Sequence, residues 1–454
     1  MVFSSIVFIF RFLPIAFIIY YLTPSKLKNL ILLGLSLFFY SWGEPKYFVI
    51  MIASILVDYT VSHLIEKCRD KIYINRGLLG ISIIFNLGML FLFKYINFFI
   101  ENINLAFGTS MSFIELTLPL GISFYTFQTM SYTIDVYRGR VQAEKNIIDF
   151  GAYVCLFPQL IAGPIVKYSD INKELKSRTI KIDMIEEGLK EFIIGLGKKV
   201  LIANNIGLLW NEIESLGVSN VSTPLLWLGI LAFSFQIYFD FSGYSSMAIG
   251  LGKMLGFTFP ENFNFPYISR SMTEFWRRWH MTLGGWFKEY VYIPLGGNRL
   301  GKRRMFINLF IVWFLTGFWH GAEYNFILWG LYFFILISLE KMFLLKFLEK
   351  HKIISHIYAI IAIIFGWAIF AFVDLNTFKY LFEARWSLDF IYYIRNYLGI
   401  FIIAILSSTK VIDNIYKKIK RNKYSECFVL ILIFVLSIAY LVDSTYNPFL
   451  YFRF

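Results

Sequence analysis

Apolar and polar positions alternate along this chain on the scale of whole helices. Long apolar runs are separated by short segments that carry most of the charge. A helix needs about 20 mainly apolar residues to cross the hydrocarbon core of a bilayer. The apolar runs predict twelve membrane-spanning helices, near residues 3–22, 28–43, 46–65, 77–99, 116–136, 185–209, 223–243, 305–321, 325–345, 354–373, 390–407 and 425–443.

The composition supports a polytopic membrane protein. Of the 454 residues, 58% are hydrophobic and only 16% are charged, whereas soluble domains average about 45–50% and roughly 25%. An ordinary cytosolic enzyme, a disordered chain and a secreted disulfide scaffold are therefore excluded. Cys68, Cys155 and Cys427 have neither metal-ligand nor redox spacing, so we expect no metal site.

The net charge of +13 is explained by topology. Lys and Arg collect in cytoplasmic loops of membrane proteins. Segments 66–76, 137–146 and 410–424 are basic, whereas 100–115 and 210–222 contain glutamates and no cation. This alternation predicts an extracytoplasmic N-terminus in a cell-membrane protein, and it removes the argument for nucleic-acid binding.

Residues 147–165 break the alternation. They are apolar but short, and Pro158, Gly163 and Pro164 would interrupt a helix. We predict a re-entrant segment that returns to the cytoplasmic side. Irregular backbone at membrane depth must be buried in protein or line a cavity, so a cavity is expected nearby.

Segment 257–304 combines eight cations with many aromatic residues. Ser271-Met-Thr-Glu274 matches a capping box and predicts a helix that begins at Met272. Helical spacing gives this helix an apolar and a charged face, which predicts an amphipathic helix at the cytoplasmic interface, with Gly284-Gly285 as a possible bend. The apolar face holds Met272, Phe275, Trp276, Trp279, Leu283, Trp286, Phe287 and Tyr290, and the charged face holds Glu274, Arg277, Arg278 and Lys288.

His320 ends an apolar run, where an ionisable side chain is costly unless it faces a cavity or a partner. Thr316 lies one turn earlier on the same face and could orient the imidazole. Gly317 and Gly321 form a small-residue pair that allows another helix to approach closely. Two interpretations remain open: a catalytic histidine, or a structural one that is bonded between helices.

Three further residues are candidates for a site. His280 lies where the two faces of the amphipathic helix meet, and it is either an interfacial structural residue or part of the chemistry. We expect Arg11, near the middle of its span, to have an acidic or carbonyl partner. Asp240 is expected to be either a structural ion-pair partner or part of a cavity wall.

Histidine suits one reaction class in this setting. The chain lacks a phosphate-cradling glycine loop, HExxH and GxSxG, which argues against ATP-driven transport and zinc or serine hydrolysis. A neutral histidine can take the proton from a hydroxyl that attacks a thioester. In a membrane tunnel, a cytoplasmic donor could meet an acceptor from outside. The alternative is a non-catalytic transporter or scaffold for polysaccharide export.

Several motifs resemble, in order, those of the membrane-bound O-acyltransferase (MBOAT) family. The ends of the chain are similar to the branch that contains the alginate O-acetyltransferase and peptidoglycan and other exopolysaccharide acetylation proteins. The family motifs are Phe157–Ile165, Tyr238–Ser245, Glu274–His280 with Tyr290–Arg299, and Phe318–Ala322, and the terminal ones are Met1–Ser5 and Asn447–Phe454.

The resemblance implies an all-α fold of about 11–12 transmembrane helices, with re-entrant and interfacial helices around a central tunnel. It covers essentially the whole chain, so we expect one membrane-embedded domain over residues 1–454. Within it, residues 1–136 are N-terminal helices, 137–345 the catalytic core and 346–454 C-terminal helices.

The resemblance also implies an acyl relay from a cytoplasmic thioester, acetyl-CoA or an acyl carrier, with no bound cofactor. The acceptor is an extracytoplasmic glycan, reached directly or through a secreted or membrane-anchored acetyltransferase partner. The family's essential histidine maps onto His320, and its tunnel-mouth histidine onto His280. A sister branch transfers D-alanine to teichoic acid, but Ile293–Arg299 looks more like the acetylation branch.

Supporting roles are expected around the two histidines. Where this chain has Lys288-Glu289-Tyr290 the family often has Arg-Asp-Tyr, and Phe333 replaces a histidine that many members carry, so no role of that histidine transfers. The tunnel candidates are Thr316, Asp240, Trp319 and Glu289, and Arg277, Arg278 and Lys288 are candidates for binding an anionic donor.

Overall fold

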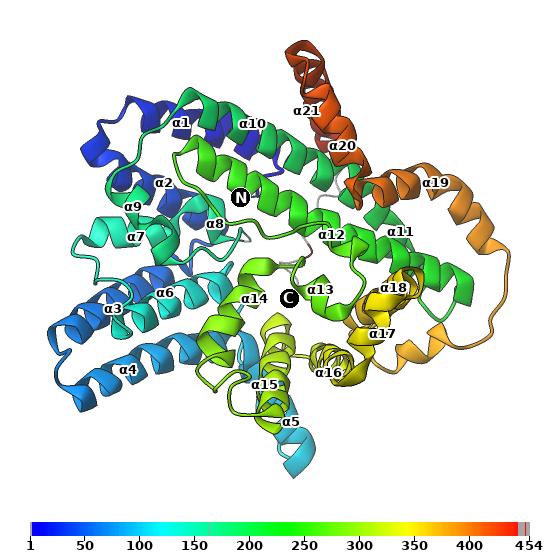
Figure 1. The fold of residues 1–454 in the computed structure, drawn as a ribbon, viewed down its shortest axis with the longest axis horizontal. Helices are drawn as coiled ribbons and strands as arrows, with labels where there is room; N and C mark the ends of the chain where they lie inside the picture. The colour runs from blue at the N-terminus through cyan, green and yellow to red at the C-terminus, as the bar shows by residue number, and fades with distance from the viewer. Residues whose placement is uncertain (1, 162, 444–449, 451–454) are drawn as a thin grey trace. The chain divides into compact units, whose positions relative to one another are not determined.

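The structure is a computed structural model that describes residues 2–161, 163–443 and 450. Over these ranges the regular elements are all helices, and none is a strand (Figure 1). The all-α prediction is therefore confirmed. Met1, Ala162 and residues 447–454 other than Leu450 belong to motifs named above but lie outside the described residues.

Eight described helices are long and apolar enough to cross a membrane, which makes this a multi-pass membrane protein. Each of the twelve predicted ranges overlaps a helix, although residues 116–121 of one range precede its helix. The four ranges outside this set of eight remain predictions as membrane spans. The eight are Phe48–Lys67, Ile72–Phe107, Ile182–Leu216, Thr223–Met254, Tyr324–Lys350, Lys352–Ala371, Asp389–Ser407 and Lys423–Asp443. The other four ranges correspond to Phe8–Leu22, Lys28–Gly43, Ile122–Tyr137 and Lys302–His320.

The chain forms two compact units, Met1–Phe192 with Met247–Pro260 and Ile193–Ser246 with Glu261–Phe454. The helices of the first are η1 (Phe8–Phe12), α1 (Leu13–Leu22), η2 (Ser25–Leu27), α2 (Lys28–Gly43), α3 (Phe48–Lys67), α4 (Ile72–Leu90), η3 (Phe91–Tyr95), α5 (Ile96–Phe107), α6 (Ile122–Tyr137), α7 (Ile147–Cys155), α8 (Phe157–Leu160) and α9 (Tyr168–Lys176). Two helices, α10 (Ile182–Gly197) and α12 (Thr223–Met254), run from one unit into the other.

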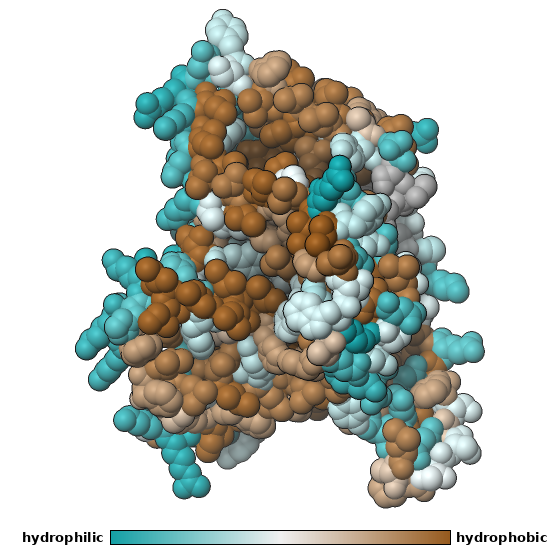
Figure 2. All heavy atoms as spheres, turned by 90° about the vertical axis from the view of Figure 1, so that its right-hand side faces the viewer, coloured by the Kyte–Doolittle hydropathy of each residue, from teal (hydrophilic) through white to brown (hydrophobic). Residues whose placement is uncertain are grey.

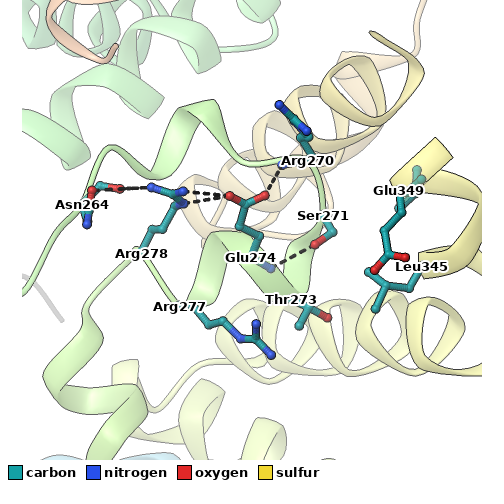
Figure 3. Close-up of a pocket in the computed structure, with 10 residues that line it drawn as sticks. Asn264, Arg270, Ser271, Thr273, Glu274, Arg277, Arg278, Leu345 and Glu349 are labelled. Atoms are coloured by element: carbon teal, nitrogen blue, oxygen red, sulfur yellow. Dashed lines mark hydrogen bonds and ion pairs between the residues drawn. The ribbon is translucent and has the colours of Figure 1, made fainter. Parts of the chain in front are cut away.

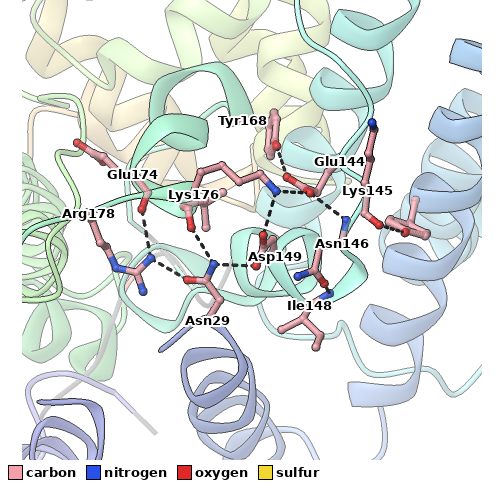
Figure 4. Close-up of polar contacts among 12 residues, drawn as sticks. Asn29, Glu144, Lys145, Asn146, Ile148, Asp149, Tyr168, Glu174, Lys176 and Arg178 are labelled. Carbon is pink, nitrogen blue, oxygen red and sulfur yellow. Dashed lines mark hydrogen bonds and ion pairs between the residues drawn. The ribbon is translucent and has the colours of Figure 1, made fainter. Parts of the chain in front are cut away.

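In the first unit a polar network joins the start of α2 to α7 and α9 (Figure 4). Lys176 Nζ lies 3.0 Å from Asp149 and also contacts Glu144. Asn29 donates to Asp149 at 2.8 Å and accepts from Arg178 at 2.7 Å. Because the two carboxylates share a cation, burying them is less costly than burying them alone.

The predicted re-entrant segment is an interrupted helix inside the first unit. α7 has nine residues, which is about 14 Å of helix and too short to cross a bilayer. The chain breaks at Leu156 and continues as α8, which has Pro158 in its first turn. The described residues of 149–166 are all buried. The interruption and burial are confirmed, and the side of the membrane stays a prediction.

The second unit contains the remaining helices. They are η4 (Lys198–Asn204), α11 (Asn205–Leu216), η5 (Pro266–Ile268), α13 (Met272–Trp276), α14 (Met281–Phe287), η6 (Lys288–Tyr292), α15 (Lys302–His320), α16 (Tyr324–Leu339), η7 (Glu340–Leu344), α17 (Leu345–Lys350), α18 (Lys352–Ala371), η8 (Thr377–Leu381), α19 (Asp389–Ser407), α20 (Lys410–Ile419) and α21 (Lys423–Asp443).

The prediction of one continuous amphipathic helix in segment 257–304 is wrong, because the structure has two short helices there. The first begins at Met272 as expected, but α13 ends after five residues and α14 begins after His280. The break is at His280, whose φ of +42° is left-handed, and Gly284-Gly285 lies inside α14. A left-handed residue cannot continue a right-handed helix, so the chain turns there. The predicted apolar face is buried except for Trp276, which is half-buried.

Exposed apolar side chains are common on the helices of the second unit. Figure 2 shows apolar atoms over large parts of one face and hydrophilic atoms gathered near its edges. Ile361 on α18 is 63% exposed, Ile403 on α19 is 50% exposed and Phe428 on α21 is 68% exposed. Such large apolar surfaces mark membrane contacts, in agreement with the length of these helices.

The two predictions about buried charges have opposite outcomes. Asp240 lies 2.5 Å from Lys199, with 3% and 2% of the side chains exposed, and accepts from Leu450 N at 2.9 Å. The ion-pair alternative for Asp240 is therefore confirmed. Arg11 is exposed, and within the described ranges its side chain has no acidic or carbonyl partner. That expectation is wrong, because an exposed long cation can extend along an apolar surface toward water.

Candidate active site

The site begins with α13, whose first turn is capped by its own side chains. Ser271 Oγ accepts from Glu274 N at 3.0 Å, as the capping box predicts. The Glu274 carboxylate accepts from Arg270 N at 3.0 Å rather than from Ser271 N. The first bond satisfies an amide group that the helix start leaves without a partner, and the second ties the preceding residue to the same turn.

A second carboxylate holds the same turn from another element. Glu340, at the start of η7, is 1% exposed. It accepts from Met272 N at 2.5 Å, Thr273 N at 2.8 Å and Tyr358 OH at 3.1 Å. A negative charge at a helix N-terminus is favourable, so Glu340 fixes where α13 starts. Glu340 was not among the predicted site residues, although it is a charge directly after an apolar run.

His280 is held in its left-handed conformation by a neighbouring strand-like segment of the chain. Asn262 O accepts from Met281 N at 2.9 Å, and Asn264 N donates to Arg278 O at 2.9 Å. Such a backbone costs about 1–3 kcal/mol and persists where the surroundings determine it, often at functional sites. His280 is 2% exposed, and burial lowers its pKa to about 3. Its imidazole is therefore neutral at neutral pH and can accept a hydrogen bond at its unprotonated nitrogen.

A cavity of about 450 Å³ leads to His280. Its exposed end is lined by the cations Arg277, Lys288 and Lys341. Its buried end is lined by His280 and by Trp313 and Thr316 of α15, the last two 8% and 7% exposed. The cavity thus runs from a basic opening to a buried end that is walled by α13, α14 and α15.

His320 is the last residue of α15 and is enclosed by aromatic rings. It is 4% exposed, and its ring centroid lies 5.0 Å from Trp319, 4.9 Å from Trp329 and 5.5 Å from Phe370. A Cβ added at Gly317 would lie 3.2 Å from the Cα atom of Gly330 on α16. The prediction that this glycine allows close helix packing is confirmed.

The two histidines flank one tryptophan. The Trp319 ring centroid lies 6.0 Å from His280 and 5.0 Å from His320. His280 is among the described residues that line the cavity, whereas His320 is not. Thr316, one turn before His320, is at the cavity wall. The structure therefore brings both candidate histidines together, with only one of them at the cavity.

Some of the other predicted site residues line the cavity, whereas others are engaged elsewhere. Thr316 donates its hydroxyl proton to Val312 O at 2.7 Å, so the proton is not available to orient His320. Arg277 and Lys288 line the cavity, but Arg278 is paired with Glu274 at 2.9 Å. Glu289 is half-buried in η6. Asp240 forms the ion pair with Lys199 described above, and a role of Asp240 in a tunnel stays a prediction.

A second cavity, of about 600 Å³, adjoins the basic opening (Figure 3). Arg270, Arg277 and Arg278 line it together with Glu274 and Glu349. In Figure 3 the Arg278 guanidinium points toward Glu274, whereas Arg277 extends away from both. Thr273 and Arg277 line both cavities. Arg277 is thus the arginine that both cavities share.

Comparisons with known proteins place these features in a family context. Residues 142–370, which contain both histidines, match the model of the membrane-bound O-acyltransferase family. A "probable alginate O-acetylase AlgI" of Pseudomonas syringae pv. tomato is 41% identical over 393 residues, 85% of this chain and 75% of the relative. A peptidoglycan O-acetyltransferase of Helicobacter pylori is 38% identical over 378 residues, 76% and 71% of the two chains. A teichoic acid D-alanyltransferase of Bacillus subtilis is 29% identical over 244 residues, 51% and 61% of the two chains.

Proposed function

The chain belongs to the membrane-bound O-acyltransferase family, and we propose that it moves an acetyl group from cytoplasmic acetyl-CoA to a hydroxyl of an extracytoplasmic polysaccharide. The transfer is direct or passes through a partner protein. Membership of this family makes the chain an enzyme, so the alternative of a non-catalytic exporter or scaffold is not favoured.

The cavity that ends at His280 carries the proposal. Three cations at its exposed end suit the phosphates of coenzyme A, because a basic opening raises the local concentration of an anionic substrate. Its volume of about 450 Å³ lies within the usual range of pockets for small ligands, about 300–1,000 Å³. The thioester would then reach the neutral imidazole of His280 at the buried end.

In the proposed chemistry His320 is the general base. It takes the proton from the acceptor hydroxyl as the oxygen attacks the thioester carbonyl carbon. The C–S bond then breaks, the new O-acetyl ester leaves, and the proton passes to the departing thiolate. His280 donates or accepts a hydrogen bond at the thioester and orients it. A histidine enclosed by aromatic rings that exclude water is suited to such proton transfer.

The polysaccharide acceptor is supported by the relatives. Two of them are named as acetylases of alginate or peptidoglycan and are matched over 71–75% of their length. The D-alanyltransferase relative is matched over a shorter part of this chain, 51%. D-alanyl transfer from a carrier protein is therefore the second candidate, and the experiment includes its donor.

The test uses membranes that contain the full chain and its glycan, supplied with labelled acetyl-CoA or carrier-bound D-alanine. We expect alkali-labile acetyl esters on the glycan and a loss of about 10²–10⁴-fold in His320→Ala, because a general base contributes that much. His351→Ala is the matched control, since His351 is exposed between α17 and α18.

Two outcomes contradict the proposal, and a third would show that the assay is unsuitable. Labelling from D-alanine alone would assign the chain to the other transfer reaction. Unchanged ester formation in His320→Ala would remove the base from the mechanism. Equal losses in His320→Ala and His351→Ala would show that the assay reports protein damage rather than chemistry.

A further inference from the structure

We propose that the paired indole rings of Trp276 and Trp313 set the acyl-chain length, so that the enzyme accepts an acetyl group and excludes longer acyl groups. The inference rests on the proposed function, because it concerns the acyl end of the same donor. In this proposal the two tryptophans act only through the volume and position of their side chains. It therefore makes them selectivity residues, distinct from the histidines.

The direction of the cavity places these rings at its inner end. Arg277, Lys288 and Lys341 are exposed and mark the opening. Trp313 is 8% exposed and lines the buried end together with His280, and the half-buried Trp276, which also lines the cavity, packs on Trp313. A donor whose phosphates remain at the cations enters with its acyl group first, so the acyl group meets the indole rings.

The two rings are packed too firmly to move aside easily. Their centroids are 4.8 Å apart in an edge-to-face arrangement. Behind them, Trp276 contacts Phe333 at 4.9 Å and Trp329 at 5.4 Å, and Trp313 contacts Phe333 at 5.7 Å. Protein interiors are packed at the density of organic crystals, so an extra methylene here requires several rings to shift.

The cavity wall also holds bulky apolar side chains, among them Phe287, Leu309 and Ile337, but it is open at two glycines. Gly284 and Gly285 line it and present no side chains. A Cβ added at Gly285 meets no atom within 4 Å, and one added at Gly284 meets only Trp276 O at 3.8 Å. Because the wall is open at these two glycines, we assign the limit on acyl length to the indole rings of Trp276 and Trp313.

Removal of the wall should change the preference for the donor more than the rate. A methylene that a hydrophobic pocket cannot accommodate is discriminated by about 10–200-fold. Trp276→Ala opens space where the added carbons of a butyryl group would lie. We expect the ratio of kcat/KM for butyryl-CoA to that for acetyl-CoA to rise at least about 10-fold.

The experiment measures this ratio in membranes that contain the full chain, with acetyl-, butyryl- and hexanoyl-CoA as alternative donors to the same glycan. The ratio is independent of the fraction of folded protein, so a lower yield of folded Trp276→Ala enzyme does not obscure it. Trp313→Leu tests the same wall with a smaller change in volume. Trp227→Ala is the matched control, because its ring packs on Phe382 at 6.5 Å and does not line the cavity.

The outcomes separate the inference from the proposed function. A raised butyryl ratio in Trp276→Ala or Trp313→Leu, with Trp227→Ala unchanged, supports the inference. An unchanged ratio in both wall variants overturns it, as does a wild-type enzyme that uses butyryl and acetyl groups equally well, and either result leaves the proposed transfer intact. A wild type that transfers no acyl group from any CoA thioester overturns the proposed function itself.

Discussion

The two histidines of this site are built in opposite ways. His320 ends a regular helix of 19 residues, and its ring is enclosed by Trp319, Trp329 and Phe370. His280 lies at a break between two short helices, in a left-handed backbone, at the end of a cavity. One position is set by regular helix packing, and the other by hydrogen bonds from distant segments.

This difference suggests separate roles within one reaction. A histidine packed between rigid helices is well placed to hold a proton in a fixed geometry, as a general base requires. A histidine at a cavity end is well placed to meet a donor that enters from the basic opening. Since Trp319 lies beside both rings, the donor and acceptor sides of the reaction would meet there.

After His320→Ala, the largest effect that tests this comparison is expected at His280. Asparagine tolerates a left-handed backbone better than most residues, so His280→Asn removes the imidazole while keeping the chain direction. We expect an activity loss of about 10²-fold, because one hydrogen bond at a developing charge is lost. His280→Ala should lose the same chemistry and also some stability, seen as a lower melting temperature in detergent. Full activity in His280→Asn would leave His280 with a structural role only.

A smaller effect is expected at Glu340, which supports His280 indirectly through α13. Glu340→Ala leaves two buried amide groups without their acceptor and should destabilise the protein by about 1–3 kcal/mol. Glu340→Gln keeps one acceptor oxygen and should recover most of the stability and of the KM for the donor. Glu349→Ala is the exposed control. If Gln and Ala at position 340 behave alike in thermal unfolding and KM, the carboxylate does not position α13.

The smallest effect is expected at the basic opening. Arg277→Gln and Lys288→Gln should each raise the KM for acetyl-CoA a few-fold with little change in kcat, because exposed charges steer a ligand weakly and are screened by salt. The difference from wild type should shrink at high salt. Lys346→Gln, an exposed lysine of α17, serves as control. A change in kcat rather than KM, or no dependence on salt, would argue that these cations do not receive the donor.

The class of the protein followed from the sequence alone, and His320 and His280 were predicted from it as site residues. Apolar runs of sufficient length can be satisfied only by helices in a membrane, and each predicted range overlaps a helix. His320 stood out because an ionisable group is costly in an apolar run. The start of α13 was predictable because a capping box acts within one turn, between Ser271 and Glu274.

Tertiary structure decided the features that depend on residues far apart in the chain. Helical periodicity predicted one continuous helix through His280, but the bonds of Asn262 and Asn264 to Met281 and Arg278 break it there. The cap by Glu340 joins positions 68 residues apart, and no local pattern reports such a contact. The aromatic wall of the cavity likewise forms only when three helices pack together. Local rules act over a single turn, whereas a cavity and its ends are properties of packing.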